Sequence, residues 1–147
     1  MAESTMRRQS DRNKELMQRF YDEVVNAGNL DVIDELLAED FVEHEELEGL
    51  PPTREGVKQF FAGMRAAFPD VTFTPEHMVA EGDMVAARVT IRGTQHGDFM
   101  GVPASGRSVE FQAIDLVQFS DAAATAHWGV SDLMTMMVQL GAAEPPG

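Results

Sequence analysis

The residues whose types and spacing best suit chemistry are an aspartate and a histidine on two neighbouring segments, 107–119 and 125–130, which both alternate as strands do. Side chains two residues apart in a strand share a face. Asp115 therefore lies among five apolar side chains, those of Val109, Phe111, Ala113, Val117 and Phe119. A carboxylate on such a face must be paired or hydrogen-bonded, or its pKa rises. The segment that follows is expected to bring His127 within reach of Asp115.

A carboxylate and an imidazole in contact can move protons. An apolar wall brings the pKa of a carboxyl group closer to neutral pH, where general acid/base catalysis is effective. The carboxylate can also fix the tautomer of the imidazole. We therefore predict Asp115 as the general acid or base and His127 as its partner. The alternative is that the two residues only hydrogen-bond each other and shape a pocket.

Length, charge and composition limit the classes of function. A chain of 147 residues is typical of one domain, and the lack of cysteine excludes disulfides, thiol catalysis and Cys-ligated metal sites. The 25 acidic residues against 11 Lys and Arg give a net charge of −14, which disfavours nucleic acid and anionic membranes as partners. No apolar stretch is long enough to span a bilayer, and we predict a cytoplasmic protein.

Elements with helical spacing come first in the chain, and alternating segments follow. Apolar residues recur at helical spacing over 11–27, in a short segment after Asn29 that includes Leu37, and between Thr53 and Pro69. Strands are predicted over four segments, namely 71–80, 84–93, 107–119 and 125–130. This order predicts an α+β fold, with about three N-terminal helices on one face of a curved antiparallel sheet around an apolar pocket.

The same pattern divides the chain into one domain and two ends. We predict a flexible arm over residues 1–10, a single domain over 11–141 and a disordered tail over 142–147. The glycine-rich segment 93–106 is expected to form a long loop near the mouth of the pocket. Four apolar side chains are predicted to line the pocket, although filling a core would explain them equally well: Phe60, Met64, Phe99 and Met100.

Three further residues have both a structural and a functional interpretation. The hydroxyl of Tyr21, the only tyrosine, is a candidate substrate contact. Asp132 is another candidate contact, or else it caps the C-terminal helical segment. Trp128 points away from His127, which favours packing or a dimer contact.

An ordered series of short motifs between Asn13 and Gly141 resembles the SnoaL-like polyketide cyclases, a branch of the nuclear-transport-factor-two-like superfamily. The motifs that carry the resemblance include Asp40-Phe-Val-Glu-His44, Ala67-Phe-Pro-Asp70, Gly93-Thr94, Phe99-Met-Gly-Val-Pro103, Ile114-Asp115 and His127-Trp128. The resemblance implies an α+β cone, usually dimeric, whose apolar cavity binds a polyketide-like substrate without metal or organic cofactor. It also implies that His44 faces this cavity and contacts substrate; the alternative is that His44 only pairs with Glu45 or Glu46 at the surface.

Cyclases of this family close a ring by intramolecular aldol chemistry, and an acid/base side chain on the last strand carries the proton. The matching position here is Gly129, which has no side chain to do so. We predict a cofactor-independent cyclase or isomerase acting on a polyketide-like or carbonyl-rich small molecule, in a homodimer without a metal. The alternatives are a hydratase or epoxide-opening enzyme on the same fold, and a non-catalytic small-molecule-binding or dimeric interaction module.

Overall fold

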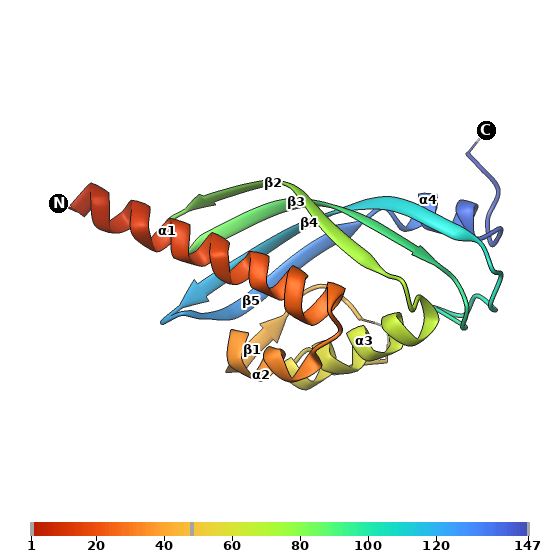
Figure 1. The fold of residues 1–147 in the computed structure, drawn as a ribbon, viewed down its shortest axis with the longest axis horizontal. Coiled ribbons are helices and arrows are strands. Elements are labelled where there is room, and N and C mark those ends of the chain that lie inside the picture. The colour runs from red at the N-terminus through yellow and green to blue at the C-terminus, as the bar shows by residue number, and fades with distance from the viewer. Residues whose placement is uncertain (1, 48, 147) are drawn as a thin grey trace.

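The computed structural model describes residues 2–47 and 49–146, in which helices cover one face of a curved five-stranded sheet (Figure 1). The predicted α+β fold is confirmed. Met1 and Gly147, the outer ends of the predicted arm and tail, lie outside the described residues. Residues 2–10 form the first half of a helix in place of the expected arm, and most of their side chains are exposed.

The N-terminal helices hold the residues that face the sheet. Helix α1 (Ala2–Arg19) continues directly into a π-helical segment, η1 (Phe20–Asn26), which contains the buried Tyr21. After a short 3₁₀ turn, η2 (Leu30–Val32), the chain forms α2 (Ile33–Leu36). Helix α3 (Arg54–Ala67) begins where the Thr53 hydroxyl accepts a hydrogen bond from the Gly56 N–H. These elements form the layer that closes the pocket from one side.

The sheet is mixed, whereas the sequence predicted it to be antiparallel. Its strands are β1 (Leu37–Glu43), β2 (Thr72–Glu81), β3 (Met84–Thr94), β4 (Ser108–Ser120) and β5 (Ala123–Ser131), in the spatial order β1-β5-β4-β3-β2. The four long strands pair antiparallel, but β1 lies parallel to β5. Leu37, which was predicted in the second helix, begins β1. The sequence pattern missed this strand because its buried face includes a glutamate, Glu43.

The core lies between the concave face of the sheet and the helices. Every apolar side chain predicted to share a face with Asp115 is buried, so the alternation in β4 was interpreted correctly. The chain ends with α4 (Leu133–Gln139), which the Asp132 carboxylate caps by accepting the Thr135 N–H. Gly141 follows with a φ of +77°, and its N–H and that of Ala142 bond the last turn of this helix.

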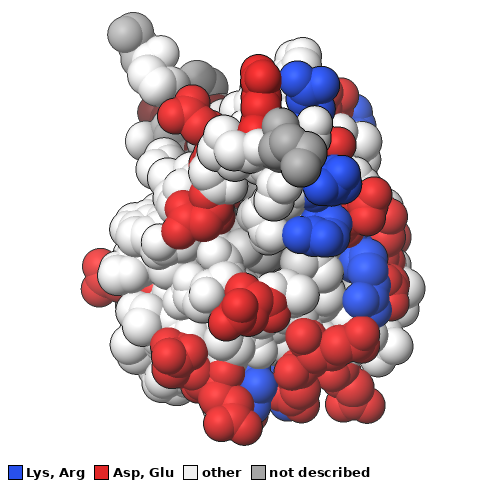
Figure 2. Space-filling view, turned by 90° about the vertical axis from the view of Figure 1, so that its left-hand side faces the viewer, with Lys and Arg blue, Asp and Glu red and all other residues white. Residues whose placement is uncertain are grey.

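The surface agrees with the excess of acidic residues. Figure 2 shows Asp and Glu side chains spread across one end of the molecule, with Lys and Arg gathered in a narrower band. Over the described residues, none of the helices combines the length and the apolar character needed to traverse a lipid bilayer.

Candidate active site

A cavity of about 590 Å³ lies between the helices and the concave face of the sheet, and most of its wall is apolar. Seven of the nine predicted site residues line it, namely Tyr21, Phe60, Met64, Phe99, Met100, Asp115 and His127. The other two, His44 and Asp132, are not among the lining residues. The cavity therefore brings the predicted proton-carrying pair together with the predicted apolar contacts.

Asp115 and His127 are in direct contact, within a chain of four polar side chains. Asp115 Oδ1 lies 2.8 Å from His127 Nε2, and Asp115 Oδ2 accepts a hydrogen bond of 2.7 Å from the Tyr21 hydroxyl. On the other side of the imidazole ring, His127 Nδ1 lies 2.6 Å from Glu43 Oε1. Strands β4, β5 and β1 and the π-helical segment η1 each supply one member of this network.

The two carboxylates keep His127 protonated. Burial disfavours the charged imidazolium, but the hydrogen bonds to Asp115 and Glu43 outweigh it and raise the pKa of His127 from 6.5 to about 10. Both ring nitrogens then carry hydrogen and donate to a carboxylate. His127 consequently has no free nitrogen with which to take a proton from a substrate. The predicted contact between His127 and Asp115 is present, and the second ring nitrogen contacts Glu43.

Tyr21 serves the same carboxylate from the helical side. Burial, together with the charge of Asp115 and the hydrogen bond to it, raises the pKa of Tyr21 well above its usual range. The hydroxyl therefore stays protonated and donates to Asp115. Because Tyr21 lies in a π-helical stretch, a feature often found at functional sites, the local backbone also singles it out.

Glu43 and Glu45 are the acidic site residues that the sequence interpretation missed. The Glu43 side chain is only 6% exposed, and besides His127 it accepts the Glu45 N–H at 2.9 Å. Glu45 follows β1 and reaches the wall of the cavity, where burial first, and then the charges of Asp115 and Glu43, raise its pKa. The alternation of Phe41, Glu43 and Glu45 was the available signal, since alternate residues of an extended segment share a face.

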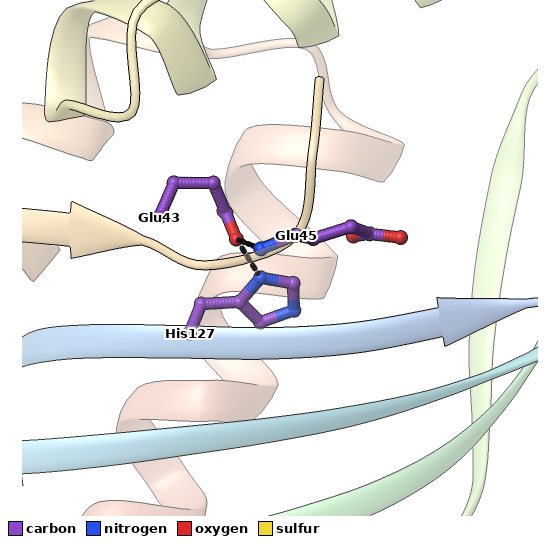
Figure 3. A group of neighbouring side chains, drawn as sticks. All are labelled: Glu43, Glu45 and His127. Atoms are coloured by element: carbon purple, nitrogen blue, oxygen red, sulfur yellow. Dashed lines mark hydrogen bonds and ion pairs between the residues drawn. The ribbon is translucent and has the colours of Figure 1, made fainter. Parts of the chain in front are cut away.

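Glu43, Glu45 and His127 also offer ligand atoms within 4.8 Å of one another, as a metal site would (Figure 3). A metal needs a deprotonated imidazole nitrogen, whereas both nitrogens of His127 face carboxylates and its pKa is raised to about 10. Figure 3 shows the Glu45 carboxylate extending away from the contact between Glu43 and His127. We therefore interpret the group as an ion-paired network and not as a metal centre.

The two remaining predicted residues have structural positions. His44 is exposed and stacks on Trp128, with ring centroids 4.6 Å apart and an angle of 4° between the planes. It points away from the cavity because it lies between Glu43 and Glu45, which both point inward. Asp132 is exposed and caps α4. The structural alternative considered for Asp132 therefore describes its contacts, and the expected cavity-facing position of His44 is not observed.

The loop between β3 and β4 forms one rim of the cavity. Gln95 is fully buried there, and its side chain bonds Val102 O, Ser105 N–H and the Ser105 hydroxyl. These bonds hold the turn that places Phe99 inward and leaves Met100, 42% exposed, at the mouth. The sequence located this loop but gave no reason to assign Gln95 a role in its structure.

Comparison with known proteins places these features in a family. A family model described as SnoaL-like polyketide cyclase matches residues 15–140. The structure is similar to TsrD from Streptomyces laurentii, with 28% identity and a TM-score of 0.83 over 90% of this chain and 97% of that one. It is also similar to IdmH from Streptomyces antibioticus, a proposed polyketide cyclase, with 36% identity and a TM-score of 0.75 over 88% and 98% of the two chains. A search of curated proteins returned no match.

Proposed function

Because the chain belongs to the SnoaL-like polyketide cyclase family, we propose that it closes a ring in a polyketide-like, carbonyl-rich small molecule by intramolecular aldol chemistry beside Asp115. The cavity is large enough for a drug-sized ligand. Its mostly apolar wall suits the carbon skeleton of such a substrate, and the homologous structures include proposed polyketide cyclases.

The observation that carries this proposal is the set of hydrogen bonds that Asp115 accepts in the cavity wall. Its two oxygens accept hydrogen bonds from Tyr21 and from the imidazolium of His127, so both act as acceptors. Each carboxylate oxygen keeps a second lone pair. Asp115 can thus accept a proton from a carbon next to a carbonyl group, and the resulting enolate attacks a second carbonyl carbon of the same molecule.

Tyr21, His127 and Glu43 act as positioning residues in this scheme. The imidazolium compensates the buried charges of Asp115 and Glu43, and it fixes the direction in which Asp115 presents its free lone pairs. Because the group is already oriented before substrate binds, little reorganisation accompanies proton transfer. This arrangement explains why a histidine without a free nitrogen is still part of the proposed site.

Proton exchange at carbon tests the proposal without knowledge of the natural substrate. We expect the protein to accelerate the exchange of the α-hydrogens of 2-tetralone, an apolar bicyclic ketone, in deuterium oxide, as followed by mass spectrometry. Asp115→Asn should lower the rate by roughly 10²–10⁴-fold, the usual contribution of a positioned general base. The matched control is Asp121→Asn, at an exposed turn position with a φ of +50° that asparagine tolerates.

The second candidate function is binding without catalysis, and Gly129 is the observation that favours it, because the last strand has no acid at that position. A protein that only binds would show saturable binding of 2-tetralone but no exchange above the rate in buffer. Exchange that depends on Asp115 would instead support the cyclase.

A further inference from the structure

The space beside Gly129 is filled by a side chain from another part of the chain. Gly129 pairs with Asp115 across β5 and β4 and so shares its concave face. A Cβ atom built on Gly129 would lie 2.7 Å from Glu45 Oε2 and 3.1 Å from Glu45 Cδ. The Cε1 atom of His127 would lie 2.8 Å from the same Cβ. The carboxyl group of Glu45, together with the edge of the His127 ring, therefore occupies the volume that a side chain at position 129 would take.

Several contacts hold Glu45 in that volume. The His44 N–H bonds His127 O at 2.9 Å, which extends the pairing of β1 with β5 by one residue. The His44 ring then stacks on Trp128 on the outer face, and the Glu45 N–H bonds Glu43 Oε1. With His44 fixed outward, the chain bends at Glu45, whose side chain lines the cavity. In Figure 3 its carboxylate extends past the imidazole ring, away from Glu43.

We propose that Glu45 is the proton donor of this site, a carboxyl group supplied by the segment after β1 in place of a side chain at Gly129. This inference rests on the proposed cyclase function, and it assigns the second half of the acid/base pair. Asp115 accepts the proton from carbon. Glu45 first donates a hydrogen bond to the oxygen of the carbonyl group that enolises, and then gives its proton to the oxygen of the carbonyl group that is attacked.

The surroundings of Glu45 favour its protonated form. Burial is the largest cause of its raised pKa, and the nearby carboxylates of Asp115 on β4 and Glu43 on β1 add to it. His127 and the Ser131 hydroxyl, both on β5, act in the opposite direction without cancelling the rise. A site that holds one carboxyl group as a hydrogen-bond acceptor and raises the pKa of a second has the two states that acid/base catalysis needs.

The proposed reaction balances with these two groups. One C–H bond breaks as its proton moves to Asp115, a C–C bond forms as the enolate attacks the second carbonyl carbon, and an O–H bond forms with the proton of Glu45. The net change moves one hydrogen from carbon to oxygen within the substrate. Transfer of the proton from Asp115 to Glu45 through water restores both groups for the next turnover.

Exchange of 2-tetralone tests the role of Glu45, because enolisation uses a base at carbon and an acid at the carbonyl oxygen. We expect Glu45→Gln to lower the rate constant of exchange by ~10²-fold, at the lower end of the range for general acid catalysis, with KM nearly unchanged. The wild-type rate should fall as the pH rises through the pKa of Glu45, since only the protonated group donates. This alkaline decline should disappear in Glu45→Gln.

The matched control is Glu39→Gln, which makes the same change on an exposed position of β1 that does not line the cavity. It should keep the wild-type rate and pH profile, and thermal unfolding should show all variants to be folded. A wild-type profile in Glu45→Gln, together with a loss in Asp115→Asn, would overturn the role of Glu45 and leave the cyclase proposal standing. A wild-type rate equal to that in buffer would overturn both.

Discussion

The two halves of the proposed site differ in how the fold holds their carboxyl groups. Asp115 lies in the middle of β4, paired on both sides by β3 and β5, and its oxygens accept from Tyr21 and His127. Glu45 lies just beyond β1, an edge strand, and depends on the contacts of the backbone and ring of His44. The first group is held by the sheet itself, and the second by a short extension of its edge.

This difference separates the two groups chemically as well. Asp115 accepts hydrogen bonds from two donors, Tyr21 on η1 and the cationic His127 on β5, so it acts as an acceptor. Glu45 is half-buried beside the negative charges of Asp115 and Glu43, and both the burial and the charges favour its protonated form. A loop side chain, Glu45, can thus take the place of a strand side chain that Gly129 lacks, provided that the loop is fixed from the opposite face of the sheet.

Asp115 with its partners Tyr21 and His127 forms the strand-held half of the site. Removing the cation from this half should have the largest effect on stability. His127→Gln leaves two buried carboxylates, Asp115 and Glu43, without their shared positive charge. We expect a loss of ~3–5 kcal/mol in the free energy of unfolding, as is usual when one partner of a buried ion pair is removed. Urea denaturation measures this. His96→Gln, at an exposed position, should change it by less than ~0.5 kcal/mol, and an equally small loss in His127→Gln would contradict the ion-pair interpretation.

The free energy of unfolding should also depend on pH through the protonation of His127, with a somewhat smaller change than in His127→Gln. The folded pKa of His127 is raised to about 10 from 6.5, so its contribution is complete below pH 6.5 and is lost as the pH rises through 10. Between those values the free energy of unfolding should fall by ~1.4 kcal/mol per pH unit, or ~3 kcal/mol from pH 7 to pH 9. The slope should be nearly absent in His127→Gln. Stability that is flat in the wild type over this range would show that His127 is not held charged.

The strand-held half of the site was predictable from sequence because strand alternation is a local rule. Five apolar residues at a spacing of two placed Asp115 on the concave face, and the next strand brought His127 to it. The helical spacing of Phe60 and Met64 placed them on the cavity wall by equally local reasoning. What this reasoning could not give was the second partner of His127, and hence the protonation state of its ring.

The loop-held half of the site, Glu45 and the segment after β1 that carries it, could not be predicted from sequence, and the reason is physical. Strand β1 lies parallel to β5, more than 80 residues away in the chain, and nothing local to residues 37–43 indicates that pairing. Without it, Glu43 and Glu45 appear as solvated acids in an acidic chain, and His44 is the residue that draws attention. The structure reverses these positions, because pairing of Glu43 with His127 turns both glutamates inward and His44 outward.

Weakening the outer-face contact should have the smallest effect on stability but a selective effect on the loop-held half. Trp128 is 38% exposed and its ring stacks on His44, so Trp128→Ala should cost ~1 kcal/mol of folding free energy. The exchange rate of 2-tetralone should fall several-fold, and the alkaline decline of its pH profile should move to another pH, because a freed His44 lets Glu45 leave the volume beside Gly129. Val130→Ala, an even more exposed change on the same face of β5, is the matched control and should alter neither the rate nor the profile.

A Trp128→Ala variant that loses stability but keeps the wild-type profile would show that the bonds from the backbone of His44 and Glu45 position the carboxyl group unaided. A parallel fall in rate at every pH would instead place the effect on the strand-held half. Only the change in pH dependence separates these cases, because it follows the one carboxyl group whose position depends on the stack.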